Sequence, residues 1–119
     1  MKTEDLKNNN INFMVCDRPK FLLSDDILNF LPRKIINIHP SLLPKYKGLN
    51  THQRAIKNNE KISGCTVHLV NFKLDSGKII LQKKVKIFKN DTPNSLKKKI
   101  LKQEHILYPR AIKKMIFNL

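Results

Sequence analysis

An asparagine, a histidine and an aspartate are the residues of this sequence whose types and spacing could do chemistry. Asn37 and His39 stand two positions apart, directly before Pro40, and Asp75 lies farther along the chain in a Leu-Asp-Ser-Gly run. An amide can donate a hydrogen bond to an oxyanion, an imidazole can carry a proton, and a carboxylate can orient that imidazole. These are the three polar groups that an acyl-transfer site needs.

The element that must position Asn37 and His39 is an isoleucine-rich segment over residues 34–39, which we predict to be a β-strand. Side chains alternate along a strand, so both polar residues point to one face. Pro40 ends the strand, and we expect the pair at the carboxyl edge of a sheet, with Asp75 reaching the same solvent-reachable cleft from a neighbouring strand. Spacing alone also fits a structural histidine and an ordinary turn aspartate.

Helical and extended segments alternate around this strand. Besides 34–39, we predict strands over 11–16, 62–70 and 79–88 and helices over 25–30, 51–58 and 93–108. Thr92 and Pro93 are typical of a helix start, and Pro109 should stop or kink the last helix, with helical structure resuming to Phe117. The pattern predicts an α/β fold in which a sheet is flanked by helices.

Length and composition narrow the possibilities. The chain has 119 residues, enough for one compact domain, and 40% of them are hydrophobic, which argues against disorder. The polar start is unlike a signal peptide, and no apolar run reaches the ~18 residues of a membrane span. Cys16 and Cys65 form no metal-binding spacing, so we expect reduced thiols, a cytoplasmic location and no metal.

The formal net charge is +15, and the lysines are densest in the second half of the chain. Such a surface could bind nucleic acid through its phosphates. It also fits a lysine-rich solvated surface, and no aromatic RNA-binding motif or arginine-rich tract accompanies the charge. A positive field would equally attract small anionic substrates.

The string Asn-x-His-Pro-Ser-Leu-Leu-Pro at 37–44, followed by Leu-Asp-x-Gly at 74–77, resembles the folate-dependent formyltransferase family. Within it the string is most similar to the glycinamide ribonucleotide formyltransferases. The resemblance runs from about residue 21 to 112 and corresponds to roughly the second half of a complete domain. It implies a partial, Rossmann-like formyltransferase fold with a mixed sheet, forming a single domain over 1–119 that lacks the N-terminal phosphate-binding half.

The resemblance also implies an activity and a set of site residues. The expected reaction moves a formyl group from 10-formyltetrahydrofolate to glycinamide ribonucleotide in purine biosynthesis, with small-molecule substrates and no metal. The implied residues are catalytic Asn37, His39 and Asp75, folate-binding Phe21, Leu22, Leu23 and Asn37, and supporting Thr66 and His68, which would hold Asp75 and an ordered water.

Two departures from the family pattern leave alternatives open. The chain has three glycines and nothing like the family's phosphate-binding loop, and the segment at 17–19 is unlike the family's pteridine-binding loop. We therefore expect weak activity unless a missing half is supplied by a partner. The alternatives are a methionyl-tRNA formyltransferase, a formyltetrahydrofolate hydrolase, and an inactive basic module that binds RNA or another protein.

Overall fold

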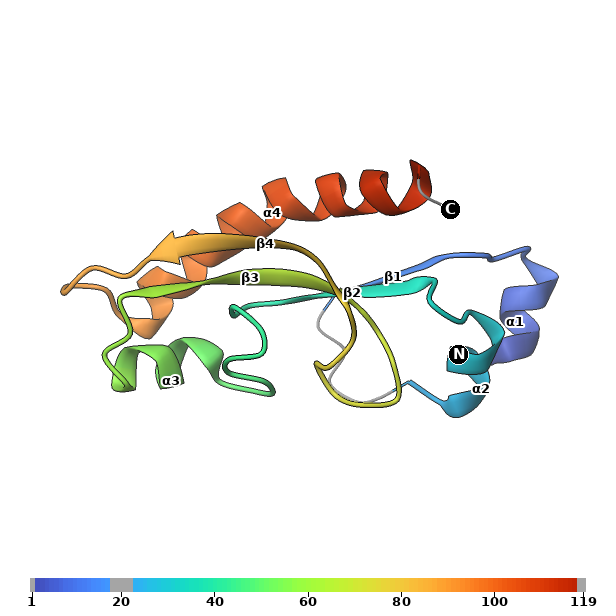
Figure 1. Ribbon diagram of the computed structural model, residues 1–119, viewed down its shortest axis with the longest axis horizontal. Coiled ribbons are helices and arrows are strands. Elements are labelled where there is room, and N and C mark those ends of the chain that lie inside the picture. Colours follow the sequence, from blue (N-terminus) through green and yellow to red (C-terminus); the bar gives the residue numbers. More distant parts are fainter. Residues whose placement is uncertain (1, 18–22, 118–119) are drawn as a thin grey trace.

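The computed structural model describes residues 2–17 and 23–117 of the chain. Figure 1 shows the elements, which in chain order are α1 (Thr3–Asn8), β1 (Met14–Asp17), α2 (Asp25–Phe30), β2 (Ile35–His39), α3 (Thr51–Lys57), β3 (Ile62–Leu69), β4 (Ile79–Lys86) and α4 (Pro93–Phe117). No helix in this described part is long and apolar enough to cross a membrane.

The four strands form one sheet in the order β1-β2-β3-β4. β1 and β2 run parallel, whereas β3 is antiparallel to both β2 and β4. The sheet is therefore mixed and flanked by helices, as predicted. The loop from β3 to β4 brings Gly77 against Leu69, where a Cβ would lie 1.6 Å from the carbonyl oxygen of Leu69, so this close approach requires glycine.

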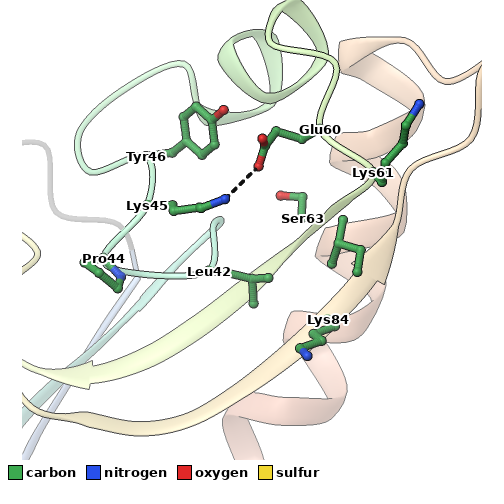
Figure 2. A pocket seen from close by; sticks show the side chains of 9 residues that line it. Leu42, Pro44, Lys45, Tyr46, Glu60, Lys61, Ser63 and Lys84 are labelled. Atoms are coloured by element: carbon green, nitrogen blue, oxygen red, sulfur yellow. Dashed lines mark hydrogen bonds and ion pairs between the residues drawn. The ribbon is translucent and has the colours of Figure 1, made fainter.

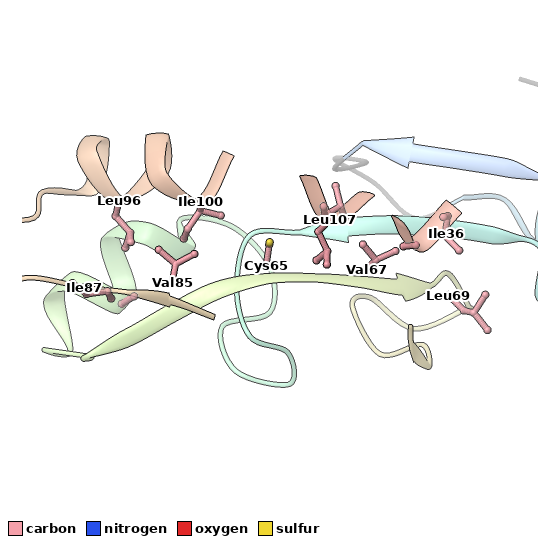
Figure 3. Packing of buried hydrophobic residues seen from close by; sticks show 12 residues of the cluster. Ile36, Cys65, Val67, Leu69, Val85, Ile87, Leu96, Ile100 and Leu107 are labelled. Atoms are coloured by element: carbon pink, nitrogen blue, oxygen red, sulfur yellow. The ribbon is translucent and has the colours of Figure 1, made fainter. Parts of the chain in front are cut away.

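Apolar side chains cover both faces of the sheet. On one face, Ile36 and Ile38 pack with residues of β3 and β4 against α4, in the cluster that Figure 3 shows. On the other face, Ile35 packs with α1 and α2. Alternation along β2 explains this division, since neighbouring residues point to opposite faces. Asn37 and His39 therefore share the face of Ile35, away from α4.

The long helix α4 begins at a well-formed cap. Asp91 accepts hydrogen bonds from the Phe88 amide at 2.8 Å, the Ser95 hydroxyl at 2.7 Å and the Lys99 ammonium at 2.5 Å. The hydrogen bond from Lys99 is the largest of the effects that lower the pKa of Asp91 to about 2. The predicted start at Thr92 and Pro93 is confirmed.

The structure refines the helix predictions at both ends of the chain. Helical structure does extend to Phe117, as predicted, but Pro109 does not stop the helix, because α4 runs from Pro93 to Phe117 with the proline inside it. Pro109 and His105, whose carbonyl loses its helical donor, are both exposed, so water can satisfy that carbonyl. No element was predicted at the N-terminus, where the structure has α1. α1 has one buried residue, Leu6, which gives no helical periodicity to detect in the sequence.

Candidate active site

Four polar side chains gather on the face of the sheet opposite α4. Asn37 pairs with His68 of β3, and His39 pairs with Thr66. Residues directly opposite one another on antiparallel strands share a face. We call these four residues the polar face, and all of them are buried. The prediction that Asn37 and His39 share one strand face is confirmed.

Asp75 reaches the polar face from the loop between β3 and β4. Its Oδ2 lies 3.6 Å from Nδ1 of His39, and its Oδ1 lies 3.8 Å from Nε2 of His68. The Gly48 amide donates a 2.8 Å hydrogen bond to Oδ2. Gly48 has φ of +83°, a backbone conformation that glycine adopts without strain and other residues rarely adopt. The carboxylate thus sits between two histidines and is held by a backbone donor.

The chain direction that brings Asp75 next to His39 differs from the predicted one. We predicted that neighbouring strands would bring their carboxyl ends together, but β3 is antiparallel to β2, so its carboxyl end lies beside the start of β2. The loop after β3 folds back over the sheet face instead. The three side chains are largely buried, because Asn37, His39 and Asp75 are 3%, 6% and 9% exposed.

His39 is fixed by contacts at both ring nitrogens. Nε2 donates to the carbonyl oxygen of Tyr46 at 2.8 Å, while Nδ1 faces the carboxylate of Asp75. A carbonyl and a carboxylate both accept hydrogen bonds, so each ring nitrogen of His39 faces an acceptor. These two contacts fix the orientation of the imidazole ring.

His68 lies in a different electrostatic setting. Its Nδ1 donates to the Leu69 carbonyl at 3.0 Å. Burial, opposed by that hydrogen bond and by Asp75, holds the pKa of His68 below its usual value. No described residue donates to Nε2 of His68, which faces a carboxylate oxygen. A neutral ring that donates from Nδ1 can only accept at Nε2, so Nε2 and the carboxylate oxygen are two acceptors that face each other.

The loop after His39 is held by a side-chain network that the sequence did not reveal. Thr66 Oγ1 donates to the Ser41 carbonyl at 2.7 Å and accepts from the Leu43 amide at 3.1 Å. Gln82 Nε2 donates to the Leu43 carbonyl at 2.8 Å and to Thr66 Oγ1 at 3.0 Å. This clamp places the loop that carries the Tyr46 carbonyl. Gln82 lies in an ordinary strand pattern, so nothing in the sequence marked it.

The expected folate-binding residues are only partly described. Phe21 and Leu22 lie outside the described residues. Leu23 packs against the apolar cluster of α1 and α2, together with Val70 at the end of β3. A cavity of about 290 Å³ lies beside this cluster and the loop that carries Asp75. Its lining is Leu28, Asn29, Pro32, Arg33, Leu69, Val70, Asn71, Phe72, Gly77 and Lys78.

A larger cavity, of about 540 Å³, lies at the far side of the loop after β2. Figure 2 shows Leu42, Pro44 and Tyr46 on the loop side of this cavity, with an ion pair between Lys45 and Glu60. The ion-pair distance is 3.3 Å. The three catalytic candidates do not line this cavity, so the acyl-transfer geometry does not depend on it.

Comparison with known proteins places this geometry in a family. The formyl transferase family matches residues 2–112. Phosphoribosylglycinamide formyltransferase of Haemophilus influenzae is 52% identical over 80 residues, which are 67% of this chain and 38% of that protein. The trifunctional purine biosynthetic protein adenosine-3 of Chironomus tentans is 46% identical over 92 residues, which are 77% of this chain and 7% of that protein.

The fold agrees with this similarity. The crystal structure of phosphoribosylglycinamide formyltransferase from Bacillus halodurans superposes with a TM-score of 0.90 at 39% identity, covering 95% of this chain and 58% of that one. The chain thus spans little more than half of a solved relative and less than half of the Haemophilus influenzae relative. With a match over most of its length, the chain belongs to the formyl transferase family.

Proposed function

We propose that this chain carries the acyl-transfer centre of a formyltransferase that moves a formyl group from 10-formyltetrahydrofolate to the amine of glycinamide ribonucleotide. One observation carries the proposal: the Asp75 carboxylate lies 3.6 Å from His39 Nδ1, beside the buried amide of Asn37. The relatives named phosphoribosylglycinamide formyltransferase support the choice of substrates.

The proposed chemistry follows from the three side chains. The substrate amine attacks the formyl carbon, and the carbonyl oxygen becomes a tetrahedral oxyanion. Asn37 donates a hydrogen bond to that oxyanion, and removal of one such donor typically costs on the order of 10²–10³ in rate. The intermediate collapses by breaking the bond between the formyl carbon and the folate nitrogen. His39 gives that nitrogen a proton, the proton lost by the attacking amine restores the imidazole, and Asp75 holds the ring in place.

Thr66 and His68 support this centre without touching the reacting atoms. Thr66 holds the loop that follows His39. We place a water molecule between His68 Nε2 and Asp75 Oδ1, because one water can donate to both acceptors. That water would fix the carboxylate on the side away from the Gly48 amide.

The cavity beside Val70 and Gly77 is the proposed place for the pteridine ring. It combines apolar walls with amide and cationic groups, as expected for a flat heterocycle with polar edges. Leu23 belongs to the adjoining cluster, which supports its assignment as a folate contact. Phe21 and Leu22 remain proposed contacts, and Asn37 would meet the folate at the formyl end.

The proposal extends to the setting of the protein. Cys16 and Cys65 are free thiols, which suits a cytoplasmic enzyme. The positive charge would attract phosphate-bearing and folate substrates. The match covers 58% of the Bacillus halodurans relative, so transfer is best assayed with the remaining portion of that relative added as a partner polypeptide, and we call this mixture the completed enzyme.

Folate binding and transfer should be measured together. We expect saturable binding of 10-formyltetrahydrofolate at physiological salt, observed by calorimetry, and formyl transfer to glycinamide ribonucleotide that Asn37→Ala reduces at least 100-fold in the completed enzyme. Lys57→Ala, an exposed change on α3, is the matched control and should leave both signals unchanged. Absence of folate binding by the folded chain, with or without the partner, would refute the proposal.

A further inference from the structure

The loop between β2 and α3 supplies a backbone contact to each member of the His39–Asp75 pair. The Tyr46 carbonyl accepts a 2.8 Å hydrogen bond from Nε2 of His39, and the Gly48 amide donates a 2.8 Å hydrogen bond to Oδ2 of Asp75. We call residues 46–49 the anchor loop. Because both contacts come from this one short segment, a displacement of the anchor loop would change the surroundings of both side chains at once.

The anchor loop has an unfavourable backbone conformation at its first residue. Tyr46 has φ of +56°, in the left-handed region that bulky side chains rarely adopt. A residue stays in such a conformation when surrounding contacts hold it there, and positions of this kind cluster at functional sites. The conformation of Tyr46 decides where its carbonyl oxygen lies. The contacts that hold Tyr46 in place consequently bear on His39.

The side chain of Arg54, on α3, binds two carbonyl oxygens of the anchor loop. Its Nη2 donates to the Lys47 carbonyl at 2.6 Å, and its Nε donates to the Leu49 carbonyl at 3.0 Å. The guanidinium is planar and rigid, so two hydrogen bonds from one side of it fix the direction of both carbonyls. Arg54 itself is anchored in the first turn of α3, where its amide donates to the Asn50 carbonyl at 3.0 Å.

One of these hydrogen bonds is transmitted directly to Asp75. The Lys47 carbonyl and the Gly48 amide belong to the same peptide group, which is planar and trans, so they point in opposite directions. Arg54 binds the oxygen of this peptide and Asp75 binds its N–H. The peptide therefore lies between the guanidinium and the carboxylate. A donor on its oxygen also polarises the peptide and strengthens the N–H as a donor to Asp75.

α3 holds the Tyr46 side chain as well. The guanidinium carbon of Arg54 lies 5.4 Å from the centroid of the Tyr46 ring, within the range of a cation–π contact. The Tyr46 hydroxyl accepts a 3.1 Å hydrogen bond from Nδ2 of Asn58, at the end of the helix. Arg54 thus contacts both ends of the anchor loop, the Tyr46 ring at one end and the Leu49 carbonyl at the other.

We propose that Arg54 is a positioning residue for formyl transfer, which aims the Tyr46 carbonyl at His39 and the Gly48 amide at Asp75. The inference rests on the proposed function for the reaction that this pair serves, whereas the arrangement of the anchor loop is a property of the folded chain. Lysine cannot replace Arg54, because an ammonium group lacks the fork that holds two carbonyls in a fixed geometry.

The first test is NMR of the full chain labelled with ¹⁵N. Arg54→Ala should shift the signals of the Gly48 amide and of Nε2 in the His39 ring, and the Gly48 amide should exchange faster with deuterium. Arg54→Lys, which keeps an aliphatic stem beside Tyr46 and so protects folding, should show the same shifts. Gln53→Ala is the matched control, because Gln53 is the exposed neighbour on α3, and it should leave these signals in place.

The second test is formyl transfer by the completed enzyme. Arg54→Ala should lower kcat at least tenfold while the KM for each substrate changes less than about twofold, since misplaced catalytic groups slow the chemical step. An unchanged kcat, unchanged His39 and Gly48 signals in folded Arg54→Ala, equal effects of Gln53→Ala, or native behaviour of Arg54→Lys would each overturn the inference. Shifted signals in a chain that transfers no formyl group even with Arg54 present would instead refute the proposed function and leave the role of Arg54 in the anchor loop standing.

Discussion

At the scale of single residues, His39 and Asp75 are the groups whose contact defines the candidate site. Their side chains are 3.6 Å apart and both are buried. We predict that His39→Ala and Asp75→Asn each abolish most formyl transfer in the completed enzyme, and that the double variant is no worse than the more damaging single one, since the pair acts as a unit. Steady-state rates of the four proteins measure this.

Neither substitution removes a large apolar group, so the free energy of unfolding should fall by a few kcal/mol at most. Urea titration provides the control for folding. Rates that fall independently and multiply in the double variant would show that Asp75 does not act through His39.

The second prediction at this scale concerns the protonation of His68. Its pKa lies below the usual 6.5 because burial disfavours the charged ring. The folded state therefore binds fewer protons than the unfolded state just below pH 6.5, so stability should decrease as the pH falls through that value. NMR of the labelled histidine ring should give a titration midpoint below 6.5. A midpoint at or above 6.5 would contradict the assignment.

At the scale of elements, the Gln82 clamp connects β4 with the loop that follows β2. Replacing Gln82 by Leu removes both hydrogen bonds of Nε2 and leaves the Leu43 carbonyl without its side-chain partner. We expect a loss of about 1–3 kcal/mol in the free energy of unfolding and a shift in the His39 ring resonances, because the Tyr46 carbonyl moves with the loop.

Lys83→Leu is the control for this change, since Lys83 is the exposed neighbour on the same strand. It should leave the His39 resonances in place. Unaltered His39 signals in a folded Gln82→Leu protein would show that the clamp does not position the histidine.

At the scale of the whole molecule, we predict that the chain alone is a poor catalyst even when folded. It spans 58% of the solved Bacillus halodurans chain, so contacts that position the substrate in a complete enzyme are expected to be missing. Turnover should stay below the ordinary enzyme range of about 1–10³ per second. Turnover within that range for the unaccompanied chain would disprove this prediction.

Local sequence patterns determined much of the fold because they report short-range preferences. Alternation placed Asn37 and His39 on one face of β2, and the Thr92-Pro93 start of α4 could be identified from capping chemistry alone. The family-specific string at 37–44 pointed to Asn37 and His39, and the Leu-Asp-Ser-Gly run at 74–77 pointed to Asp75. These signals depend on residues close together in the chain, where sequence spacing dictates geometry.

Only the tertiary structure decided how distant residues meet. The antiparallel direction of β3 makes the Asp75 loop fold back over the sheet, and the sequence contains no signal for that direction. The hydrogen bond from Gln82 to Leu43 joins β4 to the loop after β2. The hydrogen bond from His39 to the Tyr46 carbonyl joins the end of β2 to the same loop. Such contacts depend on packing of the whole chain, because side-chain types alone do not state which partners the folded backbone will bring within hydrogen-bond distance.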